Sequence, residues 1–306
     1  MKRFDIILTL LLLMSLTISA APASSRSPVV AKLSFPYATV LPGVPFDMTV
    51  TLTNTSAAPV SVGTYANLNV KLPDGSTFTP RHYVLLGTSR TNGPTCVELA
   101  PGQTIELAAS WASYDTQFTG PGLYDFSLDL TTRDKDAPSN FVGPLHTTSA
   151  RLERAVSVGE DEELWKRMAA TGQWNDTGFT SLKEGIQLRS EIVTNHITSA
   201  YYPYALLSSI TSPGKEIIAP FVDAADRFPN SPESPLLVAW AASAAIKAAG
   251  QSREQNDGEG EAQYYALADK LYQRALKSGS LTVRDDATHG LSLVANYREN
   301  IHAATK

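Results

Sequence analysis

The chain has 306 residues, a formal net charge of −5 and 43% hydrophobic residues. This length exceeds what one hydrophobic core commonly supports, so we expect two domains. The composition excludes a disordered chain, and the acidic balance argues against nucleic acid as the main partner, because phosphate binding needs a basic face.

The first residues have the pattern of an export signal. Lys2 and Arg3 precede a short, mostly apolar run over residues 6–18, and three small residues follow at 19–21. The run is too short to span a bilayer comfortably. We therefore expect a signal peptide at residues 1–21 and a periplasmic or extracellular mature protein with no stable membrane insertion. An uncleaved membrane anchor is the alternative.

Segments of alternating apolar and polar residues follow, from about residue 28 to residue 158. The clearest is PFDMTVTLTN, in which every second residue is apolar. Its expected inward residues are Phe46, Met48, Val50 and Leu52. Similar segments recur about every ten residues and are separated by turns, such as the one at Asp74-Gly75. This pattern predicts an antiparallel β-sandwich over residues 28–158.

Three stretches of this region, LPGVPFDMTVTLTN, LAPGQTIEL and GPGLYDFSLDL, resemble bacterial immunoglobulin-like domains. The resemblance implies a structural role for Tyr124, with its ring packed in the core and its hydroxyl bonded to the backbone. Cys96 is the only cysteine, so the Cys…Trp…Cys spacing of antibody domains is missing. We expect Cys96 to pack as a small apolar residue beside a strand, and a reactive thiol is the alternative.

The hydrophobic period changes from 2 to 3.6 near Val158–Gly159, which predicts an α-helical domain of about six helices over residues 159–304. Acidic residues occupy positions 160–163, in the first turn of its first helix. We expect a solvated helix start that the helix dipole stabilises, because negative charge is favourable at a helix N-terminus. A metal or partner site is the alternative.

One phrase occurs twice in the helical half. When NHITSAYYPYALLSSI is aligned with DRFPNSPESPLLVAWA, Ser199 falls on Ser231 and Pro203 on Pro235. Each copy has the pattern of a helix, a short loop and a second helix, with serine or proline where the second helix begins. Such a pair cannot bury its apolar face alone, so the copies are expected to stack.

The second copy allows a more detailed prediction. Its second helix should begin at residues 231–235 and end near Gly250, because glycine is common just past helix ends. We expect its buried face to include Leu236, Leu237 and Trp240. The polar stretch GQSREQNDGEGE should form a loop before the next helix.

RFPNSPESPLLVAW and YYALADKLYQRAL resemble tetratricopeptide-like helical repeats of bacterial envelope proteins. The usual Trp-Leu-Gly-Tyr order of that family is missing, so a compact helical domain is the alternative. The resemblance implies a groove or face that binds a peptide or protein.

Residues that could carry chemistry are scattered along the chain. The five histidines lack metal-ligand spacing, and Asp285 with His289, four residues apart on one predicted helix, is expected to be a surface pair. We therefore predict no catalytic residue, no metal site and no cofactor. The candidate binding face is Tyr201, Tyr202 and Tyr204, and these side chains could equally pack between helices.

These patterns predict an exported, non-enzymatic protein-binding or scaffold protein with a protein or peptide partner. It would use the face of the helical repeat, the loops of the sandwich, or both. The alternatives are an enzyme or accessory domain acting on envelope polymers or peptides, and a protease inhibitor. A deep cleft with converging carboxylates or histidines would favour an enzyme, and a shallow face with exposed tyrosines would favour binding.

Overall fold

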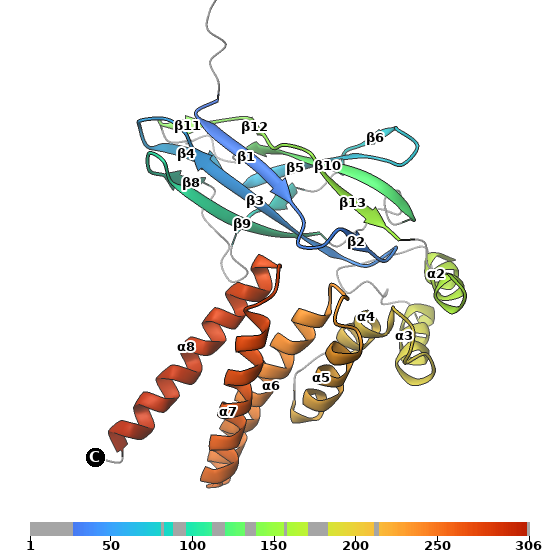
Figure 1. Ribbon diagram of the computed structural model, residues 1–306, viewed down its shortest axis with the longest axis vertical. Coiled ribbons are helices and arrows are strands. Elements are labelled where there is room, and N and C mark those ends of the chain that lie inside the picture. Colours follow the sequence, from blue (N-terminus) through green and yellow to red (C-terminus); the bar gives the residue numbers. More distant parts are fainter. Residues whose placement is uncertain are drawn as a thin grey trace, which may run out of the picture.

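The described residues of the computed structural model are 27–80, 83–87, 96–111, 120–131, 139–155, 158–170, 183–210 and 214–304. Strands come first and helices second, as the change of hydrophobic period predicts. Figure 1 shows the sheets at one end of the molecule, with the long helices α6, α7 and α8 extending away from them. The predicted signal peptide lies outside the described residues.

The N-terminal half consists of β-sheets. Its strands are β1 (Val29–Ser34), β2 (Thr39–Val40), β3 (Phe46–Asn54), β4 (Val60–Gly63), β5 (Tyr65–Lys71), β6 (Thr77–Phe78), β7 (Tyr83–Leu85), β8 (Cys96–Leu99), β9 (Thr104–Trp111), β10 (Gly122–Thr131), β11 (Phe141–Val142), β12 (Leu145–His146) and β13 (Ala150–Arg154). One sheet has the order β1-β3-β9, a second β2-β13-β10-β5-β6 and a third β11-β4-β8. Most pairs are antiparallel, but β2 runs parallel to β13 and β4 parallel to β11.

The alternation predicted for β3 is confirmed. Its four inward side chains are at most 2% exposed, and they meet inward residues of β5 and β10 in one hydrophobic core. Phe46 and Phe126 lie edge to face, with ring centroids 5.3 Å apart. The structural role predicted for Tyr124 is also confirmed, because its ring is buried and its hydroxyl donates to the Gly120 carbonyl at 2.9 Å.

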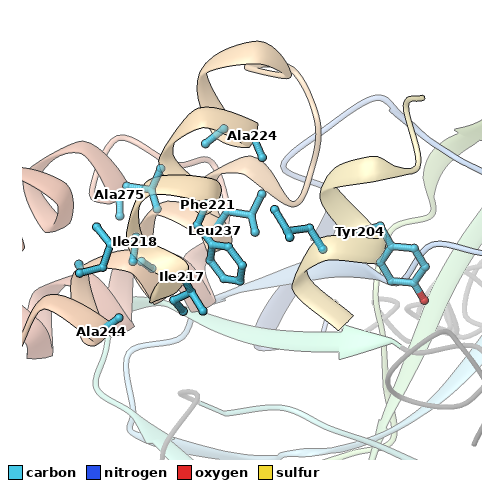
Figure 2. Close-up of a cluster of buried hydrophobic side chains, with 14 of the residues drawn as sticks. Tyr204, Ile217, Ile218, Phe221, Ala224, Leu237, Ala244 and Ala275 are labelled. Carbon is cyan, nitrogen blue, oxygen red and sulfur yellow. The ribbon is translucent and has the colours of Figure 1, made fainter. Parts of the chain in front are cut away.

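The C-terminal half consists of helices. They are α2 (Glu160–Ala170), α3 (Lys183–Asn195), α4 (Tyr202–Ser208), the short 3-10 helix η2 (Lys215–Ile217), α5 (Ile218–Arg227), α6 (Ser234–Glu254), α7 (Gly258–Ala275) and α8 (Leu281–Ala304). α6 is central, because it packs against both α5 and α7. Figure 2 shows part of the resulting core, in which Phe221 of α5 and Leu237 of α6 lie together.

The predicted end of α6 at Gly250 is wrong, because the helix continues to Glu254. The stop comes at Asn256, which adopts a left-handed conformation with φ 59°. Its amide donates to the Arg253 carbonyl at 3.0 Å, and the Asp257 amide donates to the Ser252 carbonyl at 2.9 Å. These two bonds satisfy the last carbonyls of the helix, so asparagine performs the function expected of the glycine.

In the stretch GIQLRSEIVTNHI, the helical spacing of the apolar residues predicts one shared face made of Ile186, Ile192, Val193 and Ile197, and this face of α3 needs correction. Ile186 is 43% exposed, and Ile197 lies beyond the end of the helix and is 46% exposed. The buried side chains are Leu188 and Ile192, which are four residues apart and therefore share one face. Ile186 precedes Leu188 by two residues, a spacing that places it on a different side of the helix.

The contact between α7 and α8 leads to a prediction at Gly290. A Cβ atom added there would lie 2.1 Å from the ring of Tyr272, which is buried in α7. Alanine usually stabilises a helix interior by roughly 1 kcal/mol relative to glycine, but this clash should cost about 1–3 kcal/mol. We expect Gly290→Ala to lower the midpoint of thermal unfolding.

Gly250→Ala is the matched control, because a Cβ added at Gly250 of α6 would meet nothing within 4 Å. This variant should raise the midpoint, so the same substitution has opposite signs at the two sites. Equal effects in calorimetry would contradict the packing of Tyr272 against Gly290.

Candidate functional site at the junction of the two halves

The repeated phrase forms the same turn twice. In the first copy the Ser199 amide donates to the His196 carbonyl at 3.0 Å, and in the second the Ser231 amide donates to the Phe228 carbonyl at 3.0 Å. In each copy the next helix begins three residues after the serine, with proline in its first turn. The predicted unit of helix, loop and helix is therefore confirmed for α3–α4 and for α5–α6.

The residue before each second helix is buried at the side of the β half. Tyr201 precedes α4 and is 0% exposed, and its hydroxyl donates to the Pro42 carbonyl at 3.1 Å. Glu233 takes the same place before α6 and is 6% exposed. The first copy of the turn thus attaches the helices, through Tyr201, to the loop between β2 and β3. The second copy places a buried carboxylate, that of Glu233, at the same position.

The tyrosines predicted as a binding face do not form an exposed surface. Tyr201, Tyr202 and Tyr204 are all at most 7% exposed, which agrees with the alternative that they pack. Arg227 lies over the ring of Tyr202, with its guanidinium carbon 4.9 Å from the ring centroid. Tyr204 lies on α4 with its hydroxyl pointing away from Phe221 and Leu237 (Figure 2), and it lines the pocket described below.

Arg154 is the last residue of β13. It holds in place the loop between β2 and β3, which contacts the helices. It is 1% exposed, and its Nη1 donates to the carbonyls of Leu41 at 2.8 Å and Val44 at 3.1 Å. Burial lowers the pKa of its guanidinium to about 10, so it stays protonated at neutral pH. Val44, held in this way, belongs to the hydrophobic core of the helical half.

A pocket of about 330 Å³ lies where the two halves meet, and we call it the junction pocket. Its apolar lining comes from both halves: Pro45 and Phe46 belong to the β half, and the helical half contributes Leu207, Ile210, Pro232, Leu236, Trp240 and Val283. Its polar groups also come from both halves. The polar lining residues are Tyr37, Asp47, Tyr204, Ser208 and Glu233. A small ligand or a single side chain matches this volume.

Asp47 lies at the start of β3 and ties it to α8. The Ser280 hydroxyl, just before α8, donates to the Asp47 carboxylate at 2.5 Å, and the Asp47 amide donates to the Tyr37 hydroxyl. Arg284 of α8 forms a second tie, to Glu106 of β9, at 3.2 Å. These contacts hold one wall of the junction pocket in place.

Glu233 is the most deeply buried carboxylate of the pocket. Burial raises the pKa of Glu233 from 4.5 to about 6, and the nearby charge of Asp47 acts in the same direction. The Ser231 hydroxyl donates to the carboxylate and opposes this shift. At neutral pH Glu233 is therefore ionised, in surroundings that favour its neutral form.

The acidic start of α2 was expected to be solvated. Two of its carboxylates instead contact the turn between α3 and α4. The Glu160 carboxylate lies 2.5 Å from Nδ1 of His196, and the Ser199 hydroxyl donates to Asp161 at 2.5 Å. Nε2 of His196 also lies 3.2 Å from Glu191 of α3. These carboxylates raise the pKa of His196, chiefly through the bond to Glu160.

The other candidates from the sequence stay apart from the junction pocket. Within the described ranges, no three or more His, Cys, Asp and Glu side chains are grouped as metal ligands would be. His289 is exposed on α8, and Cys96 is half-buried at the start of β8. Nor does any helix in the described part of the chain have the length and apolar character needed to cross a membrane.

No family model matches the chain, and no curated protein sequence matches it significantly. Solved structures give partial similarities. The alkylpurine DNA glycosylase AlkC of Pseudomonas fluorescens is 17% identical, with a TM-score of 0.29 over 42% of this chain and 31% of the glycosylase.

Two isolated domains are also similar. The CARDB domain of the PF1109 protein of Pyrococcus furiosus is 12% identical, with a TM-score of 0.24 over 42% of this chain and 93% of the domain. The ASH/PapD-like domain of human CEP192 is 14% identical, with a TM-score of 0.28 over 47% of this chain and 99% of the domain. These scores are too low to assign a fold family or a function.

Proposed function

We propose that this is an exported, non-enzymatic binding or scaffold protein whose protein or peptide partner inserts a side chain into the junction pocket. The observation that carries the proposal is the lining of the pocket, which combines apolar side chains with a few polar groups. Binding sites commonly have this composition, because apolar area supplies affinity and a few polar groups fix orientation.

The architecture proposed with this function is an immunoglobulin-like sandwich joined to a tetratricopeptide-like repeat. The buried ring and backbone bond of Tyr124 support the first part. The recurrence of one turn geometry at Ser199 and Ser231 supports the second part, because repeat proteins stack copies of one unit. The binding site then lies between the two architectures, rather than on the open face of either.

Blocking the pocket tests the proposed function. Ser208 ends α4 and lines the pocket, so Ser208→Trp should fill it. Ser292→Trp is the matched control, because Ser292 is exposed on α8. We expect affinity capture from the envelope fraction of the producing cell to recover the same partner with the wild type and Ser292→Trp, and to lose it with Ser208→Trp. Equal recovery with all three proteins would place the binding site elsewhere.

An enzyme is the second candidate, because two carboxylates line one pocket and the pKa of one of them is raised. A carboxyl group whose pKa is raised can serve as a general acid or base near neutral pH. Incubation with envelope polymers and peptides, followed by mass spectrometry, tests this candidate. Products formed by the wild type but not by Glu233→Gln would favour the enzyme over the binding protein.

A further inference from the structure

Glu233 is buried and, in the described part of the chain, has no basic partner, unlike two other carboxylates of the helical half. Glu261 pairs with Arg253, and Asp226 pairs with Arg274. Among the described residues, the one side-chain donor to the Glu233 carboxylate is the neutral hydroxyl of Ser231. A buried carboxylate without a counter-ion is unfavourable, so a cation that enters the pocket would gain a strong interaction.

Arg154 is a buried cation of the same junction, but no ion pair joins it to Glu233, and its Nε and Nη2 have no hydrogen-bond partner among the described residues. Arg154 directs its Nη1 at the carbonyls of Leu41 and Val44, and its guanidinium lies over the ring of Phe46. It does not line the junction pocket. The negative side of the pocket therefore consists of Asp47 and Glu233, with the phenols of Tyr37 and Tyr204 as neutral neighbours.

The phenols stay neutral because burial raises the pKa of both Tyr37 and Tyr204 well above the ordinary value. Phenol oxygens can accept hydrogen bonds from a positively charged donor. Leu236, Trp240 and Val283 also line the pocket and offer apolar contact. The pocket thus suits a ligand with one charged donor group and a hydrocarbon stem.

We propose that the junction pocket binds an alkylammonium group, namely the side chain of a lysine from the partner protein. The ammonium pairs with Glu233 and Asp47, and the four-carbon stem packs on the apolar lining. Lysine combines these two features in one side chain, because its stem is apolar and its head carries three donors. This inference rests on the proposed function and specifies which residue type the partner inserts.

A metal cation fits the pocket less well. Calcium takes six to eight oxygen ligands, and zinc favours cysteine and histidine. The pocket has two carboxylates, and much of its remaining lining is hydrocarbon. The apolar lining would leave a metal ion poorly coordinated but would contact the stem of an organic cation.

Two ligands that differ only in the ammonium group test the proposal. Nα-acetyl-lysine amide and Nα-acetyl-norleucine amide have the same unbranched four-carbon stem, and only lysine is charged. We expect the full chain to bind the lysine amide at least tenfold more tightly than the norleucine amide, as measured by NMR titration of the Trp240 indole signal. Glu233→Gln should abolish most of this preference and leave the weak norleucine binding unchanged.

Glu98→Gln is the control for net charge, because Glu98 is exposed on β8 and the substitution also removes one negative charge. It should bind the lysine amide as the wild type does. Circular dichroism of Glu233→Gln checks that a loss of binding does not reflect unfolding. Equal binding of the two amides by the wild type, or full retention of lysine binding by Glu233→Gln, would overturn the proposal.

The outcome also separates this inference from the proposed function. If the lysine amide fails to bind but Ser208→Trp still prevents capture of the partner, the pocket is a binding site for a different side chain. If lysine binds as expected and Ser208→Trp leaves capture unchanged, the pocket binds lysine but does not mediate the captured interaction.

Discussion

Leu237→Ala should reduce the free energy of unfolding by about 2–5 kcal/mol, the range for truncating a buried leucine. Leu237 is 0% exposed and lies beside Phe221 in the core between α5 and α6 (Figure 2). The substitution removes apolar contacts and leaves a cavity, because surrounding helices relax only in part. Calorimetry should show an unfolding midpoint lower by several degrees.

Leu293→Ala is the matched control for this prediction. Leu293 lies on α8 and is 43% exposed, so its truncation removes little buried area. Its unfolding midpoint should stay close to that of the wild type. If Leu237→Ala were as stable as Leu293→Ala, the face of α6 assigned to the core would be wrong, and so would the alignment of the two repeated turns.

Glu233→Gln should stabilise the protein at pH 7.5 and have little effect near pH 4. The pKa of Glu233 is about 6 in the folded protein, above its ordinary value of 4.5. Folding therefore favours the protonated form, and stability falls as the pH rises from about 4.5 to about 6. Since one pKa unit corresponds to about 1.4 kcal/mol, the expected gain at pH 7.5 is on the order of 2 kcal/mol.

Glutamine cannot ionise, so the variant should lack this part of the pH dependence. It retains an amide oxygen that can accept the hydrogen bond from Ser231. The measurement is urea unfolding of both proteins at several pH values between 4 and 8. The curves should meet at low pH and separate above about pH 5, whereas Glu98→Gln should follow the wild type throughout. Parallel curves for Glu233→Gln would mean that Glu233 is solvated in the folded state.

Much of the local structure could be predicted because it depends on nearby residues. The alternation in β3 specifies which side chains face inward, and the alignment of Ser199 with Ser231 identifies two turns with the same backbone bonds. One error arose where a second residue could perform the same function. Asn256, rather than Gly250, ends α6, since asparagine also tolerates the left-handed conformation.

The candidate site could not be predicted in the same way, because its parts are distant in sequence. Ser280 donates to Asp47 across 233 positions, and no local pattern indicates that contact. One signal was present in the alignment, which places the acidic Glu233 opposite Tyr201. A charged residue at a position that is buried in the other copy is a reason to expect a function.

The attachment of the loop before β3 has a consequence for how binding and domain motion are linked. Val44 packs in the helical core, and Pro42 accepts a hydrogen bond from Tyr201. We call these contacts between the halves the seam, and the next residues, Pro45 and Phe46, line the junction pocket. A ligand that touches both walls binds only while the seam is closed, and it therefore opposes separation of the halves. A substitution that increases the population of the closed form raises the affinity for that ligand in proportion to that population. The contacts of residues 42–44 with the helices therefore contribute to the affinity of the pocket, although these residues do not line it.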